Sequence, residues 1–334
     1  MPAKIGMPRG MYFYKYYPFI ETFMTEMGAE LVPSPETTKE ILDSGVQHCI
    51  DDACLPVKIF HGHAAALRDK VDFLFIPRLT SMSRGEYICP KFGGLPEMVK
   101  YSVPDLPPLI DTEFNLYKSR RGLEKALLEI GGRIGSGKYL RIRRALEKAD
   151  CAHNIFKAAI GQGNTPDRII NGSKQLNNGS RHTVGIVGHP YLLYDGYSNM
   201  NLLKKLNDND IRFVTPEMVD PHIIGERCCE LQKRMFWSSG KNIIGSALYM
   251  MDSSKIDGML VLTAFGCGID SLAIEYIERT ARKYYKKPLM VLNIDEHTGD
   301  ASFNTRLDAF KDLLNWRCKD ENNLSPHGRS VYSS

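Results

Sequence analysis

Three cysteines stand in sequence contexts that suit thiolate ligands of a metal cluster. Cys54 lies just before a Leu-Pro pair, Cys89 precedes Pro90, and Cys267 lies between two glycines. Proline and glycine let the backbone turn sharply, so distant loops could present their thiols to one point. Thiolates gathered from separate loops are typical of iron–sulfur clusters, whereas compact zinc modules take their ligands from tight local pairs. Cys49 lies near Cys54 and could supply a fourth ligand.

Two of these cysteines are expected next to a helix start. Pro56 suits the first turn of a helix, because its missing N–H group needs no partner there, and this places Cys54 at the N-terminus. The helix dipole at that end favours a thiolate and an anionic cluster. For Cys267, we expect Asp270 or Ser271 to cap the helix that follows.

The other four cysteines lie within helical patterns, where a thiol is more often a small buried residue than a ligand. Two of them are adjacent and cannot point the same way on a helix. The four are Cys151, Cys228, Cys229 and Cys318.

Catalytic side chains are not fixed by the sequence, and three candidates stay open: His61, Glu296 and His297. His61 and His63 resemble a metal-ligand pair, but such neighbours diverge on a helix, so packing or substrate contact is the better interpretation. Glu296 and His297 follow a predicted strand and could form an acid–base or substrate-binding loop. A capped turn before the next helix fits these two residues equally well.

No convincing nucleotide site is visible in the sequence. Residues 132–138 have the Walker A spacing, but Tyr139 stands where Ser or Thr would bind magnesium. A charged helical segment also precedes them where a strand is required. We therefore expect no nucleotide bound by this chain itself. The basic runs around Arg120 and Arg143 indicate either a solvated helix face or a surface that docks an acidic partner.

The composition excludes several classes of protein. In 334 residues, hydrophobic residues make up 43% and charged residues 25%, as in ordinary globular proteins. No apolar run has membrane-spanning length, and no secretory signal is visible. Eight cysteines without an export signal favour a reducing, cytoplasmic setting. A formal charge of +4 tolerates an anionic substrate but does not argue for nucleic acid.

Short apolar runs alternating with helical segments predict an α/β fold with two Rossmann-like parallel-sheet domains related by internal duplication. The first and third strands start 67 residues apart in one half and 73 in the other, which favours the duplication. The predicted strands are 4–8, 29–32 and 71–76, then 183–190, 211–214, 256–262 and 287–294. The main predicted helices are 18–27, 37–43, 57–67, 199–206, 272–283 and 306–316.

The predicted domains place the cysteines at one cleft. An N-terminal Rossmann-like domain (1–114) carries Cys49, Cys54 and Cys89, and a C-terminal one (182–318) carries Cys267. A helical connector and linker (115–181) joins them, and a polar tail (319–334) follows. Open parallel sheets bind ligands beyond the carboxyl ends of their strands. Because Cys89 and Cys267 each follow the third predicted strand of their half, we expect them to meet, with Cys54 joining from a helix start.

Five segments together resemble one family. They read KIGMPRG (4–10), DACLPVK (52–58), CPKF (89–92), FGCGIDSL (265–272) and DEHTG (295–299). The chain is similar to the acyl-CoA dehydratase activase-related group, akin to the iron–sulfur catalytic subunits of 2-hydroxyacyl-CoA dehydratases and benzoyl-CoA reductases. The resemblance extends from residue 4 to about residue 316.

The resemblance implies a cofactor and a ligand set. In those enzymes three cysteines hold a cluster, two of them some thirty-odd residues apart and the third far downstream. Here 34 residues lie between Cys54 and Cys89, and 177 between Cys89 and Cys267. A 4Fe–4S cluster is therefore implied, or the double-cubane 8Fe–9S cluster of some relatives, with these cysteines as ligands of the iron. Cys49 is a candidate addition to the set.

The resemblance also implies a function and partners. We predict an iron–sulfur component of an ATP-dependent low-potential reductase or dehydratase system, to which an ATP-hydrolysing activase delivers electrons. A homodimer or a paralogous dehydratase-like subunit would complete the assembly. An acyl-CoA substrate follows from kinship alone, because the chain lacks obvious features that recognise CoA. The alternative is a non-catalytic cluster carrier or regulatory binding protein, which four cysteine ligands, Cys49 included, would favour.

Overall fold

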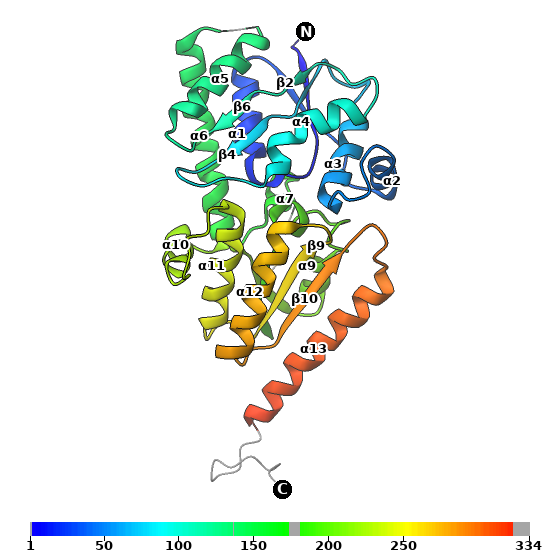
Figure 1. The fold of residues 1–334 in the computed structure, drawn as a ribbon, viewed down its shortest axis with the longest axis vertical. Coiled ribbons are helices and arrows are strands. Elements are labelled where there is room, and N and C mark those ends of the chain that lie inside the picture. The colour runs from blue at the N-terminus through cyan, green and yellow to red at the C-terminus, as the bar shows by residue number, and fades with distance from the viewer. Residues whose placement is uncertain (1, 136, 174–180, 323–334) are drawn as a thin grey trace.

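Two parallel β-sheets flanked by helices form the two halves of the chain (Figure 1). The computed structural model describes residues 2–135, 137–173 and 181–322, with side chains up to residue 316. The first sheet has the order β2-β1-β3-β5 and the second β10-β9-β7-β8. The first contains β1 (Lys4–Met7), β2 (Glu30–Pro33), β3 (Phe73–Phe75) and β5 (Leu109–Ile110). The second contains β7 (His182–Val187), β8 (Ile211–Val214), β9 (Gly258–Ala264) and β10 (Leu289–Ile294).

Both sheets share one strand order. The first strand of each half lies between the second and the third: β1 pairs in parallel with β2 and β3, and β7 pairs in parallel with β8 and β9. The predicted α/β architecture with parallel sheets is therefore confirmed. The internal duplication and the exact domain boundaries stay predictions, which the shared order favours.

A strand that the sequence did not predict follows the third strand of the first half. The strand predicted over 71–76 is β3, which ends at Phe75 and is followed by β4 (Arg78–Ser81). Pro77 stands between them and has no N–H to donate, so the ladder cannot run through it. β4 pairs in parallel with β6 (Glu113–Asn115) in a separate two-stranded sheet. Cys89 therefore follows β4 rather than the third strand of the main sheet.

The first helix begins before the residue predicted as its start. The sequence pattern places the start at Pro18, but α1 (Phe13–Glu26) contains that proline in its interior. The side chains of Phe13, Tyr14 and Tyr17, which precede Pro18, are buried. Burying each large side chain contributes about 1.5–3 kcal/mol, enough together to offset the cost of about 3 kcal/mol for an interior proline.

Close backbone contact positions the helix that follows Cys54. α2 (Lys39–Gln47) and α3 (Leu55–Ala65) meet at two glycines. A Cβ at Gly45 would lie 2.0 Å from the Lys58 carbonyl oxygen, and a Cβ at Gly62 would lie 1.9 Å from the Ile41 carbonyl oxygen. No larger residue fits at either position, so the two helices are fixed at a short distance.

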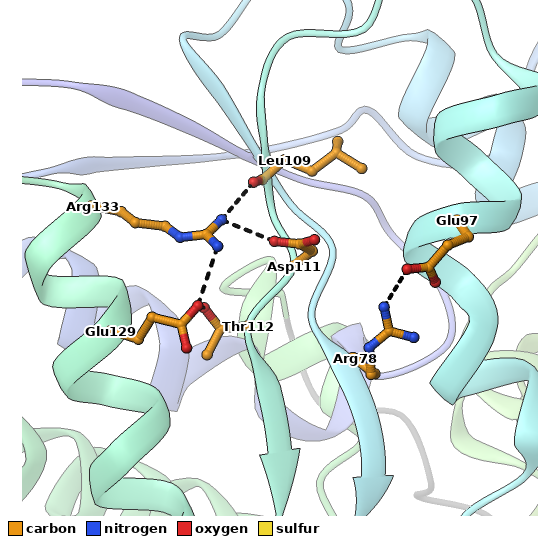
Figure 2. A network of polar contacts seen from close by, with 7 residues as sticks. All are labelled: Arg78, Glu97, Leu109, Asp111, Thr112, Glu129 and Arg133. Atoms are coloured by element: carbon orange, nitrogen blue, oxygen red, sulfur yellow. Dashed lines mark hydrogen bonds and ion pairs between the residues drawn. The ribbon is translucent and has the colours of Figure 1, made fainter.

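An arginine on β4 positions the helix that follows Cys89. α4 (Pro90–Ser102) lies beside β4, and Arg78 donates to the Gly93 carbonyl oxygen at 2.6 Å. Arg78 also pairs with Glu97, as Figure 2 shows. Because both partners lie on α4, the arginine anchors this helix to the strand before the Cys89 loop.

The region predicted as a connector is helical where it is described, and it packs on the first half. Its helices are α5 (Arg121–Arg133), α6 (Tyr139–Gly161) and α7 (Pro166–Ile170). Arg133 of α5 donates to the Leu109 carbonyl oxygen at 3.0 Å and pairs with Asp111 at 2.9 Å (Figure 2). α6 packs against α1, where Lys148 pairs with Glu26 at 2.8 Å. The predicted linker falls partly on residues 174–180, outside the described residues.

Two helices of the second half start or end differently from prediction. α12 begins at Gly268 rather than at residue 272, because Asp270 enters the first turn and Cys267 becomes the N-cap. α13 runs to Asn322, so residues 319–322 of the predicted polar tail are helical, and residues 323–334 lie outside the described residues. The helices of this half are α8 (Pro190–Leu193), α9 (Leu202–Asp208), the 3-10 helix η1 (Pro216–Met218), α10 (Pro221–Cys229), α11 (Ser238–Asp252), α12 (Gly268–Tyr284) and α13 (Asp300–Asn322).

The sequence predicts no apolar run long enough to span a membrane. Within the described ranges, no helix combines the length and the apolar surface that crossing a bilayer requires.

A buried polar network joins the two halves around one carboxylate. Asp195, in the loop after α8, accepts hydrogen bonds from Thr37 and, at 3.3 Å, from the Tyr14 hydroxyl, both of the first half. The backbone N–H and the hydroxyl of Ser198 donate to its other oxygen at 2.8 Å. Thr37 also contacts Nε2 of the buried His63 at 2.9 Å. An apolar core that includes residues of both sheets surrounds this network.

We expect Asp195→Ala to lower the free energy of unfolding by about 2–4 kcal/mol, because it leaves several buried donors without an acceptor. Urea denaturation checks this. Asp43→Ala is the matched control: Asp43 pairs with Lys39 on an exposed helix face, and its loss should cost less than about 0.5 kcal/mol. Equal losses in both variants would show that the buried network does not hold the halves together.

Candidate metal centre

One cavity of about 640 Å³ lies between the two halves. Residues of the first half line one side of it, including Cys54 and Cys89, and residues of the second half line the other, including Cys267 and His189. The structure thus brings together the three cysteines that the sequence predicts as ligands. Their role as ligands stays a prediction.

Each of the three cysteines is the N-cap of a helix. Cys54 precedes α3, Cys89 precedes α4 and Cys267 precedes α12. Prolines in the first turn start α3 and α4, where a missing N–H costs nothing. The N-terminal ends of three helices, each carrying partial positive charge and free N–H groups, therefore lie at one cavity.

A glycine with positive φ shapes the loop that carries Cys267. Gly266 has a φ of +78°, a conformation that glycine adopts without strain. A Cβ at this position would lie 3.6 Å from the Cys54 Cα and 3.8 Å from the Asp52 carbonyl oxygen. The loop after β9 therefore packs directly on the loop before α3, and this contact places Cys267 beside Cys54.

A buried ion pair stands next to Cys267. His189, at the carboxyl end of β7, places its Nε2 atom 2.8 Å from Asp270 Oδ1 and 3.9 Å from the Cys267 sulfur. Thr263 donates to the other Asp270 oxygen at 2.9 Å. Burial alone lowers the pKa of His189, but Asp270 and Cys267 together raise it well above its usual value. The pair with Asp270 favours the charged form of the imidazole beside Cys267, and the Asp270 carboxylate offsets its charge.

The expected capping of α12 by Asp270 or Ser271 is wrong. The Asp270 side chain is committed to His189 and Thr263, and the Ser271 hydroxyl donates to the Cys267 carbonyl oxygen at 2.9 Å. Cys267 occupies the N-cap position, and its side chain makes no capping hydrogen bond.

Two of the cavity thiols are harder to ionise than a free cysteine. Burial raises the pKa of Cys54, and the positive charge of Lys91 partly opposes this rise. Burial also raises the pKa of Cys89, and the neighbouring Cys267 and Cys54 add to the shift. A metal that bound these thiols would have to replace their protons.

Cys49 does not line the cavity. It lies at the end of α2, half-buried at the edge of the apolar core, with its N–H donating to the Val46 carbonyl oxygen. Cys151 and Cys229 are exposed, and the half-buried Cys228 donates to the Lys241 carbonyl oxygen at 3.2 Å. The Cys318 side chain lies outside the described residues.

The three catalytic candidates from the sequence do not line the cavity either. His61 is buried in α3 with Nδ1 2.7 Å from the Val57 carbonyl oxygen. Glu296 pairs with the buried Lys58 and so joins the loop after β10 to α3. His297 is exposed. A catalytic role for these residues stays a prediction.

Two acidic groups of the cavity were not expected from the sequence. Glu217 of η1 lines the cavity and accepts a hydrogen bond from the Tyr194 hydroxyl at 2.6 Å, and burial raises the pKa of its carboxyl. Tyr191 stacks on His189 with 4.9 Å between ring centroids, and burial, followed by Asp270, raises its pKa well above the usual value. Burial therefore disfavours the charged form of both groups. His189 could have been found from its place directly after a strand, but Glu217 has no sequence signal.

Residues 4–219 match the model of a family described as CoA enzyme activase uncharacterised domain (DUF2229). The chain belongs to this family. The match of the activase-related domain includes Cys54, Cys89 and His189 but ends before Cys267. No curated protein matches the chain. The family therefore supports the predicted kinship at the coarser level, whereas similarity to dehydratase iron–sulfur subunits stays a prediction.

Proposed function

We propose that Cys54, Cys89 and Cys267 hold an iron–sulfur cluster, and that the protein is the iron–sulfur component of an ATP-dependent low-potential reductase or dehydratase system. One observation carries the proposal: three thiols from three separate loops, two in the first half and one in the second, line the same cavity. Such a donor set suits iron–sulfur ligation. When bound, the cluster would supply a one-electron centre of low potential.

The charge around the thiols supports an anionic group. Three helix N-termini and Lys91 lie beside the three cysteines, together with His189, whose charge Asp270 balances. The helix N-termini and Lys91 favour bound thiolates. A 4Fe–4S cluster has more iron atoms than these cysteines can ligate, which leaves room for a substrate ligand. The double-cubane 8Fe–9S cluster is the alternative.

The remaining cavity walls can handle protons. Burial raises the pKa of the Glu217 carboxyl, and burial, followed by Asp270, raises the pKa of the Tyr191 hydroxyl, which lies close to the three thiols. Both side chains line the cavity. A reduction or dehydration that consumes or releases a proton could therefore exchange it with Glu217 or Tyr191 without bulk water. An acyl-CoA remains the substrate that kinship suggests.

Two alternatives differ in their ligands. A cluster carrier would need a fourth tight ligand, and Cys49 is the candidate, although it does not line the cavity. A mononuclear metal site is the other alternative, because ligand atoms of His189, Cys267 and Asp270 lie within 4.8 Å of one another. The His189–Asp270 ion pair would have to break to form it.

Anaerobic purification and reconstitution, followed by iron and sulfide analysis, test the cluster. We expect about four irons and four sulfides per chain for a 4Fe–4S cluster. Cys54→Ala, Cys89→Ala and Cys267→Ala should each lose it. Cys228→Ala, a half-buried cysteine outside the cavity, should retain it.

Three other results would change the assignment. A protein that stays colourless and free of iron has no cluster. Zinc in place of iron supports the mononuclear site. Loss of the cluster in Cys49→Ala supports the carrier.

The partner proposal concerns an ATP-hydrolysing activase that docks near the cavity, with a homodimer or a paralogous subunit completing the assembly. Family membership supports it. The basic residues Arg120 and Arg143 are partly neutralised by Asp150 and Glu147, so the rim of the cavity is the better docking surface.

Mixing the reconstituted protein with an activase from the same source, ATP and a reductant under anaerobic conditions tests this partnership. We expect ATP hydrolysis to change the redox state of the cluster, seen by electron paramagnetic resonance. A non-hydrolysable ATP analogue is the control. Hydrolysis without any change at the cluster would remove the activase from the account and favour the carrier.

A further inference from the structure

Two segments, one from each half, meet at one wall of the cavity. The segment 82–89 joins β4 to α4, and the segment 230–237 joins α10 to α11. Glu86 and Ile88 of the first segment line the cavity, and so does Ser238, which directly follows the second segment. The two halves therefore close one side of the cavity where these segments meet.

Backbone hydrogen bonds pair the two segments. The Tyr87 N–H donates to the Phe236 carbonyl oxygen at 2.8 Å, and the Ser238 N–H donates to the Tyr87 carbonyl oxygen at 2.9 Å. Tyr87 thus forms a parallel bridge with Trp237, outside the strands of the sheets. Because no longer ladder extends this bridge, the pairing is weak by itself.

Two side-chain contacts add to this pairing. Lys241 pairs with Glu86 at 2.8 Å, and Arg234 donates to the Gly85 carbonyl oxygen at 3.1 Å. Gly85 has a φ of +71°, and a Cβ there would lie 3.0 Å from a terminal nitrogen of Arg234. A residue with a side chain would be strained at this position and would press on the arginine.

The aromatic side chains of the two segments do not hold them together. Tyr87 stacks on Tyr117 of its own half, with 4.7 Å between ring centroids, and Phe236 lies against Trp237 at 4.2 Å. Among the described residues, no ring of one segment is paired with a ring of the other. Tyr87 and Phe236 are already exposed, at 46% and 48%. Separating the segments would therefore expose little additional apolar surface.

Other contacts between the halves are buried and harder to break. The Asp195 carboxylate accepts hydrogen bonds from both halves, and the Lys58 side chain, which is 4% exposed, pairs with Glu296. Breaking these contacts would leave buried polar groups without partners, whereas water can replace the partners lost at the Tyr87 bridge. Separation at the bridge is therefore the easier motion.

We propose that the Tyr87–Trp237 bridge is a latch that opens and closes the cavity, while the buried contacts of Asp195 and Lys58 keep the halves together. Opening exposes the three cavity cysteines to molecules from solution, and closing excludes water from them. The latch does not depend on whether these cysteines bind a cluster. It is therefore tested on the iron-free, full-length chain.

One latch hydrogen bond can be deleted without changing the helix beside it. Ser238 is the first residue of α11, where proline fits because the N–H has no partner within the helix. The preceding Trp237 has a ψ of 120°, the extended conformation that a residue before proline prefers. Ser238→Pro therefore removes the N–H that binds Tyr87 and keeps α11. Ser238→Ala retains that N–H and is the matched control.

The rate at which N-ethylmaleimide labels each cysteine, followed by mass spectrometry, measures opening. We expect Ser238→Pro to label the three cavity cysteines about threefold to tenfold faster, the effect of one lost hydrogen bond, and Ser238→Ala to match the unsubstituted chain. The exposed Cys151 and Cys229 should keep their rates. Unchanged labelling of the cavity cysteines, or an equal change in both variants, would overturn the proposal. Equally faster labelling of Cys49, which lies outside the cavity, would show general loosening and reject the latch.

Hydrogen exchange of the unsubstituted chain decides the question if Ser238→Pro fails to fold. After correction for intrinsic rates, we expect the Tyr87 and Ser238 amides to exchange at least about tenfold faster than the Ser198 amide, which donates to Asp195. Equal protection of the three amides would contradict a latch. A chain that passes these tests but never takes up iron supports the latch and rejects the cluster, whereas the reverse result rejects the latch alone.

Discussion

The contact between two cysteine loops determines what this protein can do. Gly266, with its positive φ, lies in the loop after β9, so close to the backbone before α3 that a Cβ would lie 3.6 Å from the Cys54 Cα. This contact joins the second half to the first beside Cys54 and Cys267. The buried network around Asp195 and the Lys58–Glu296 pair join the halves at other points. The cavity between the halves is therefore held by contacts on several sides.

Two electrostatic effects on the ionisation of the cavity cysteines oppose each other. Burial holds protons on Cys54 and Cys89, whereas three helix N-termini favour negative charge. A bound metal would resolve the conflict, because it replaces the protons and leaves the thiolates within a positive field. Glu217 and His153 line the same cavity, and burial raises the pKa of the Glu217 carboxyl.

Local signals predicted much of this structure from sequence. Pro56 located the start of α3 within one residue of Cys54, and apolar runs located the strands of both four-stranded sheets except β5. What failed depended on tertiary context. Burial of Phe13 and Tyr14 carried α1 past Pro18, and the His189–Asp270 pair moved the start of α12. Glu217 and His153 line the cavity only because η1 and α6 meet there. No residue spacing in the sequence predicts this contact.

The central claim is that one cluster joins the two halves through Cys54, Cys89 and Cys267. Anomalous diffraction at the iron edge, from crystals grown anaerobically with the reconstituted protein, tests it most directly. The account predicts iron density within the cavity, in contact with the sulfur atoms of all three cysteines, and none at Cys49. Density at the His189–Cys267–Asp270 group alone, or bound by cysteines outside the cavity, would contradict it.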